Sequence, residues 1–133
     1  MSQRDIEILR ESFEAFEREG VEALLAYIDP EFEVTVPPNV SVEPDTYRGH
    51  DGVRRYFESF YEVMDEVHLL TYDYIPVGDR VVAVGALKAR GRETGIEAEI
   101  PTFTVCTFRD GKILGFELFV TLDEAMEAAE RAS

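Results

Sequence analysis

The sequence predicts an α+β domain in which N-terminal helices pack into the concave face of a curved, mostly antiparallel sheet. Apolar residues recur at helical spacing in the first half of the chain. After Asp65, short runs rich in apolar and β-branched residues alternate with tight turns. Helices first and strands afterwards is the order typical of α+β domains. At 133 residues, the chain is long enough for one such domain with a core of its own.

The individual elements follow from the same patterns. We expect helices over 2–20, 21–28 and 49–64, with a strand at 32–36 and a loop over 37–47 between the last two helices. Four strands are expected at 69–77, 81–91, 96–108 and 112–120, and a closing helix at 122–132. Because the turns between these strands are short, the strands should form an antiparallel meander.

Charge and cysteine content exclude several classes of function. The chain carries 13 basic and 28 acidic side chains, a net charge of −15, so nucleic acid and anionic membranes are not expected as partners. One cysteine and two distant histidines offer no metal-ligand spacing, and we expect neither a metal nor another cofactor. No stretch has the pattern of a signal peptide or a membrane span, so the expected location is the reducing cytoplasm.

Three local patterns, taken in order, resemble a known family. They are YRGHDG (47–52) opening the third helix, FRDGKI (108–113) at the last hairpin and DEAMEA (123–128) in the closing helix. With the predicted elements around them, they resemble the SnoaL-like domain of the nuclear transport factor 2-like superfamily. That resemblance covers the whole chain and implies a single domain over 1–133 with the cystatin-like cone barrel of ketosteroid isomerases and polyketide cyclases. It also implies an apolar pocket inside the cone.

The catalytic groups of that superfamily are missing at the matching positions. The resemblance puts the essential aspartate of the cyclases and epoxide hydrolases at Leu118, and the protonated acid of the isomerases at Thr104. The isomerase base falls near Val36, and the arginine and second aspartate of the hydrolases fall near Gly85 and Leu87. None of these residues can replace the acid or base, so we expect the standard activities to be absent or very weak. Whether the protein is an enzyme stays open.

The pocket itself is implied by the resemblance, and strand alternation from the turn at Asp110-Gly111 indicates which strand residues face it. The expected lining is Phe13, Phe16, Tyr56, Phe60, Thr102, Thr104, Cys106, Phe116 and Leu118. If a reaction occurs, the candidates are Thr104 as hydrogen-bond donor and Tyr56 or Glu117 as the acid-base group. Glu117 would face the pocket only through a β-bulge, and Glu97 and Glu99 would also need a bulge to reach it.

Two functions from different classes follow. The first is a small-molecule binding protein for an apolar compound, and polycyclic and carbonyl-bearing compounds are among the candidates. Such a protein could also be a weak enzyme of the isomerase, cyclase or hydrolase type. The second is a non-catalytic dimeric interaction or scaffold module whose cone is filled by its own side chains. An open cavity favours the first function and a collapsed cone favours the second.

The outer face of the last two strands predicts a homodimer. Its residues by alternation are Phe103, Val105, Ile113, Glu117 and Phe119, an apolar set with a single charge. Such a patch needs a cover, and a second copy of the chain would bury roughly 1,600 Å² in total. The superfamily resemblance also implies dimerisation through this face. The alternative cover is the closing helix, folded back over the sheet of a monomer.

Overall fold

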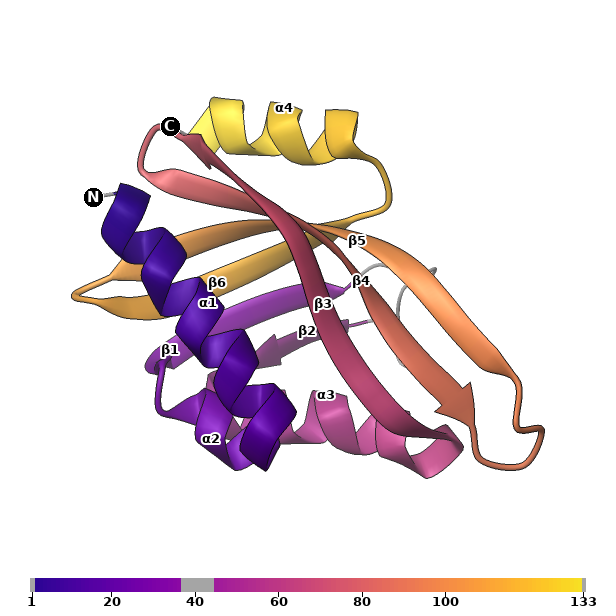
Figure 1. Cartoon of the computed structure of the whole chain (residues 1–133). Helices are drawn as coiled ribbons and strands as arrows, with labels where there is room; N and C mark the ends of the chain where they lie inside the picture. The colour runs from indigo at the N-terminus through magenta and orange to yellow at the C-terminus, as the bar shows by residue number, and fades with distance from the viewer. Residues whose placement is uncertain (1, 37–44, 133) are drawn as a thin grey trace.

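The computed structural model describes residues 2–36 and 45–132, and it confirms the predicted α+β class (Figure 1). Within these ranges the elements are, in order, α1 (Ser2–Glu19), α2 (Val21–Leu25), β1 (Ile28–Val36), β2 (Asp45–Arg48), α3 (Gly49–Val63), β3 (Met64–Val77), β4 (Arg80–Gly91), β5 (Glu97–Arg109), β6 (Lys112–Phe119) and α4 (Leu122–Ala132). None of these helices combines the length and apolarity needed to cross a bilayer.

One curved sheet organises the described part of the molecule, with the strand order β2-β1-β6-β5-β4-β3. Strands β3 to β6 form the predicted antiparallel meander, whereas β1 pairs with β6 in parallel and with β2 antiparallel. Helices α1, α2 and α3 lie on the concave side of the sheet and α4 lies on the convex side (Figure 1). The sheet is therefore mixed but mostly antiparallel.

The second helix is shorter and the first strand longer than predicted. Helix α2 ends at Leu25, and β1 already begins at Ile28. Ile28 pairs with Ile113 on β6, and the Ile113 N–H donates to the Tyr27 carbonyl at 2.9 Å. Pairing with a distant strand therefore outweighs the local helical pattern, as tertiary contacts often do. Pro30 lies in the irregular stretch of the β1–β6 ladder. No regular ladder bond there requires the N–H that proline lacks.

Strand β2 was not predicted. The expected loop over 37–47 falls outside the described residues at 37–44, but Asp45–Arg48 pairs with β1 from Val36↔Asp45 to Glu33↔Arg48. This four-residue strand buries Tyr47 completely. One apolar residue in four gives no period-2 pattern, so its pairing could not be inferred from the sequence.

Apolar side chains pack on both faces of the sheet. The larger core fills the cone between the sheet and α1–α3. A smaller cluster on the convex face joins Val82 and Val105 of the sheet to Ala125, Ala128 and Ala129 of α4, with Phe103 and Phe119 partly buried at its margin. Helix α4 thus covers much of the outer patch from which a dimer was expected, as the alternative had proposed.

The predicted outer position of Ile113 is wrong because β6 contains a bulge. Thr107 pairs with Gly115, but the next residue, Phe108, pairs with Ile113, so Leu114 is an extra residue in β6. An extra residue reverses the alternation on one side of the bulge. Ile113 consequently faces the inner core and is completely buried.

Candidate functional site

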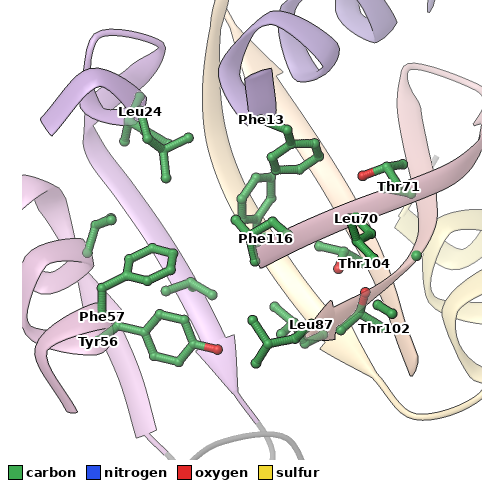
Figure 2. A pocket seen from close by; sticks show the side chains of 18 of the residues that line it. Phe13, Leu24, Tyr56, Phe57, Leu70, Thr71, Leu87, Thr102, Thr104 and Phe116 are labelled. Atoms are coloured by element: carbon green, nitrogen blue, oxygen red, sulfur yellow. The ribbon is translucent and has the colours of Figure 1, made fainter. Parts of the chain in front are cut away.

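A cavity of about 90 Å³ lies inside the cone, between the sheet and the helices (Figure 2). Its lining is Phe13, Leu24, Ile28, Phe32, Val34, Val53, Tyr56, Phe57, Leu69, Leu70, Thr71, Ala83, Gly85, Ala86, Leu87, Thr102, Thr104, Phe116 and Leu118. Ligand sites for drug-sized molecules usually have about 300–1,000 Å³. A cavity of this size is suited to a small molecule or to one ring of a larger one.

Strand pairing brings the polar part of the wall together. Ala83 pairs with Thr104 and Gly85 with Thr102, so both threonines lie on the inner face next to small residues of β4. The small neighbours leave the space that larger side chains would fill. Tyr56 reaches the cavity from α3, and its hydroxyl points towards the sheet wall that carries Leu87 (Figure 2).

Gly85 is required by the path of β3. A β-carbon at Gly85 would lie 1.9 Å from the Leu70 carbonyl oxygen, far inside contact distance. The ladder between β3 and β4 shifts register between Thr71 and Asp73, which bends β3 over this part of β4. The same bend places Leu69, Leu70 and Thr71 in the cavity wall.

Hydroxyl groups are the polar side-chain groups of this cavity. Within the described part of the chain, the hydroxyls of Tyr56, Thr102 and Thr104 make no hydrogen bond, and no fully buried side-chain donor or acceptor lacks a partner. These three hydroxyls therefore border open space. Among the described lining residues, there is no carboxylate, imidazole, ammonium or guanidinium group. The wall can offer hydrogen bonds to a ligand but no permanent charge.

The phenol of Tyr56 stays protonated at neutral pH. Burial raises its pKa above the ordinary value of 10, and the neighbouring Tyr47 raises it further. Tyr47 lies with its ring centroid 5.2 Å from that of Tyr56. Tyr56 can therefore donate or accept a hydrogen bond, but it cannot act as a general base near pH 7.

The structure brings six of the nine predicted pocket residues to the cavity wall: Phe13, Tyr56, Thr102, Thr104, Phe116 and Leu118. The other three, Phe16, Phe60 and Cys106, lie in the surrounding core instead. Phe16 packs on Phe57 with ring centroids 4.9 Å apart, and Phe60 packs on Tyr56 at 5.2 Å. These rings form a layer behind the wall, which helical spacing alone cannot distinguish from the wall itself.

The carboxylate candidates lie on the other side of the sheet. Glu117 pairs with Val105, is exposed and belongs to a groove on the convex face. The β4–β5 ladder runs without a register shift from Arg90↔Glu97 to Val81↔Cys106, so Glu97 and Glu99 also stay exposed and outside the cone. β6 does contain a bulge, but it lies at Leu114 and does not turn Glu117 inward. Glu117 therefore faces outward.

Residues of β1, β3 and β4 also line the wall, although the sequence pattern did not predict them there. These include Phe32 and Val34 of β1, Leu69 of β3 and Leu87 of β4. Alternation within β1 and β4 could have assigned Phe32, Val34 and Leu87 to the inner face. The bends of β3 depend on tertiary packing and have no signal in the sequence.

Close to the cavity, ion pairs fix β1 against the last hairpin. Arg109 donates to Asp29 at 2.9 Å and to Glu31 at 2.9 Å. The hydrogen bonds from Arg109 lower the pKa of Asp29, and the backbone N–H of Glu31 lowers it further. His50, at the start of α3, lies with Nε2 2.9 Å from the Ile28 carbonyl oxygen. The ion pairs hold β1 against the last hairpin, and the His50 contact holds the start of α3 against β1.

Comparison with known proteins agrees with this architecture. The family model of the SnoaL-like domain matches residues 9–116, most of the chain. The chain belongs to the SnoaL-like domain family. None of the curated proteins compared with this SnoaL-like chain is similar enough to count as a match.

Solved structures of other SnoaL-like and nuclear transport factor 2-like proteins share its fold. A nuclear transport factor 2-like protein of unknown function from Burkholderia pseudomallei is 25% identical with a TM-score of 0.77, over 93% of this chain and 95% of that one. TerC, co-crystallised with polyporic acid, is 25% identical with a TM-score of 0.78, over 96% and 98%. A nuclear transport factor 2-like protein from Burkholderia thailandensis is 28% identical with a TM-score of 0.75, over 94% and 95%.

Proposed function

We propose that this SnoaL-like domain binds a small, uncharged apolar molecule, or the apolar ring of a larger one, inside the cone. The observation that carries the proposal is the cavity with three hydroxyls, of Tyr56, Thr102 and Thr104, that have no partner in the described chain. An apolar space with a few convergent polar groups is the usual form of a small-molecule site. A module whose cone is filled by its own side chains would leave neither the space nor the free hydroxyls.

Binding without turnover is the better fit to the chemistry of the wall. Proton transfer near pH 7 needs a group that can change its charge there, and the described lining offers only the protonated Tyr56 phenol. Thr104 can orient a carbonyl by a hydrogen bond but cannot take its proton. We therefore expect no robust isomerisation of a steroid enone and no hydrolysis of a terpene epoxide. Enzyme assays with these two substrates test the expectation.

The relatives give a first choice of probe. TerC, which shares the fold at 25% identity, was co-crystallised with polyporic acid. Small apolar compounds and polyporic acid should raise the melting temperature of the protein in a concentration-dependent manner, because a ligand that binds only the folded state stabilises it.

Leu118→Trp provides the structural test of this proposal. Leu118 lines the cavity opposite the helices, so an indole there should fill the space and abolish the ligand-dependent shift. The substitution should cost about 1–3 kcal/mol of stability, as overpacking usually does. Ile96→Trp is the matched control, because Ile96 is 68% exposed at the β4–β5 turn. If Leu118→Trp binds as well as the unchanged protein, the site lies elsewhere.

We further propose that two copies associate through the part of the convex face that α4 leaves open. This strip is a groove between β1, β6 and β5, and its lining includes Glu33, Thr35, Leu114 and Glu117. It is more polar than the patch expected from the sequence, since α4 takes up much of the apolar part. Glu117 would there pair with an arginine or threonine of the second copy.

A cytoplasmic location also stays a proposal, based on the single, buried Cys106.

A further inference from the structure

A groove runs over the cavity along the seam between α1 and β3. Its lining is Arg10, Phe13, Glu14, Glu17, Arg18, Leu69, Leu70, Thr71 and Tyr74. Four of these residues, Phe13, Leu69, Leu70 and Thr71, also line the cavity, so the groove and the cavity share a wall. Figure 2 shows Phe13, Leu70 and Thr71 on the same side of the cavity.

This shared wall is made of side chains. Helix α1 and strand β3 lie side by side without backbone pairing, since β3 is at the edge of the sheet and pairs with β4 only. The Phe13 ring is only partly buried, and it meets Phe116 at 6.3 Å between centroids in a tilted arrangement. Side chains near the surface change rotamer within nanoseconds, so we expect the Phe13 ring to rotate on this timescale. The seam is therefore the part of the wall that can open without moving the sheet.

The charges at this seam are unequally satisfied. Glu14 pairs with Arg18 at 4.0 Å, and Glu17 pairs with His68 at 3.1 Å. Arg10 lies over the Tyr74 ring at 5.5 Å, but no carboxylate of the described residues lies within ion-pair distance of it. An arginine without an acidic partner among the described residues is available to an external anion.

Helix geometry aligns this arginine with the cavity. Arg10 and Phe13 are three residues apart on α1, so their side chains lie on one face about 4.5 Å apart along the axis. A molecule with its ring beside Phe13 would therefore place a group two or three carbons away next to the guanidinium. Guanidinium groups bind carboxylates in a planar, bidentate geometry.

We propose that the α1–β3 seam is the mouth of the cavity and that Arg10 holds the carboxylate of an amphipathic ligand there, such as an arylalkanoic acid whose ring enters the cone. The proposal rests on the proposed function, because it needs the cavity to take the ring. It adds the class of compound: an apolar body for the uncharged interior, and an anionic end that stays outside in water.

Two probes of the same shape test the charge. They are 3-phenylpropanoate and its uncharged amide, 3-phenylpropanamide, titrated into the full chain while backbone amide resonances are followed by NMR. Both should shift resonances of Thr102 and Thr104, and the carboxylate should also shift those of residues 10–14. Arg10→Gln should weaken binding of the carboxylate by up to about fivefold, the upper end of the range for one exposed ion pair, and leave the amide unchanged.

Arg4→Gln is the matched control. Arg4 lies on the same helix as Arg10 and is exposed, and its substitution changes the net charge by the same amount. It should leave the binding of both probes unchanged. If the amide binds in the cone but Arg10→Gln and Arg4→Gln affect the carboxylate equally, the anion site is disproved while the cavity remains a binding site. If neither probe shifts Thr102 or Thr104, the proposed function fails as well.

Discussion

At the scale of single residues, burial decides the chemistry of Cys106. The thiol is completely buried, and burial raises its pKa well above the ordinary value of 9. Only the thiolate is a good nucleophile, so a thiol held neutral in the core is inert. Cys106 therefore acts as a small packing residue, although it is the one cysteine of the chain.

The first prediction concerns the reactivity of this thiol. In the folded protein at pH 7, Cys106 should not react with a disulfide reagent over the time in which an exposed cysteine reacts completely. In concentrated urea, where the chain is unfolded, one equivalent of cysteine per chain should react with the reagent. The variant Glu93→Cys, at an exposed turn, provides the positive control and should react at once in the folded state. Fast reaction of the unchanged protein would show that the core opens around β5.

Residue by residue, the candidate site was predictable where strand alternation applied. Thr102, Thr104, Phe116 and Leu118 were assigned to the inner face from the turn between β5 and β6, and they line the cavity. Cys106 has the same orientation but lies deeper in the core. Alternation gives the side of the sheet, whereas the distance from an open space depends on how all the layers pack.

At the scale of elements, the bend of β3 depends on Gly85 of the neighbouring strand. The Leu70 carbonyl oxygen occupies the place that a side chain would take, since a β-carbon there would lie 1.9 Å from it. Such a contact cannot be relieved by rotating a side chain, because the opposing atom belongs to the backbone.

The second prediction follows from this contact. Gly85→Ala should lower the stability by about 1–3 kcal/mol, as insertion of an extra group into a packed region does. It should also shift amide resonances of Leu70 and Thr71, because β3 must move away. Urea unfolding and NMR measure the two effects. An unchanged urea midpoint with unchanged resonances at these residues would contradict the close approach.

The third prediction concerns the connection between β1 and the last hairpin. Hydrogen bonds from Arg109 lower the pKa of Asp29 below its ordinary 3.8, so folding favours the ionised carboxylate. This contribution is present above the unfolded pKa and is lost as the pH falls through the lowered folded value. Asp29→Asn should therefore lower the urea midpoint at pH 7, and the difference from the unchanged protein should shrink below about pH 4.

Glu33→Gln is the control for this pair. Glu33 also lies on β1 and pairs with Arg48 at 3.0 Å, but both side chains are half exposed or more, so little stability depends on them. Its effect should be small at both pH values. A difference between Asp29→Asn and the unchanged protein that keeps its full size as the pH falls well below 4 would mean that the side chain stabilises β1 by its shape rather than by its charge.

The order and type of the elements were predictable, and their irregularities were not. Periodic apolar residues predicted α1, α3, the four-stranded meander and α4. The sequence did not predict the end of α2, the short β2 or the extra residue in β6, because each depends on a partner far away in the chain. Backbone pairing of this kind uses N–H and C=O groups that every residue other than proline carries.

At the scale of the whole molecule, α4 changes what the outer face can do. Its alanines pack on Val82 and Val105, so the apolar patch predicted for a partner is partly satisfied within one chain. The proposed association uses the groove beside α4, where Glu33 and Glu117 lie near Leu114 and Thr35. An interface with these carboxylates should be weaker than a purely apolar one unless each finds a partner.

The fourth prediction is therefore a dimer that depends on Leu114. Light scattering on the unchanged protein should give twice the mass of 15.1 kDa, and Leu114→Glu should give a monomer. Ile96→Glu, an equally apolar-to-acidic change at an exposed turn, should remain dimeric. A monomeric mass for the unchanged protein would disprove the association, and a dimer unaffected by Leu114→Glu would place the interface elsewhere.

The extra residue in β6 has a consequence for how this chain can evolve. Loss of one codon at Leu114 would restore regular alternation and turn either Ile113 or the stretch from Gly115 to Phe119 to the opposite face of the sheet. In the second case Glu117 would enter the cone and Leu118 would leave it. One deletion of three nucleotides would then give the cavity the carboxylate that it lacks, without a single substitution.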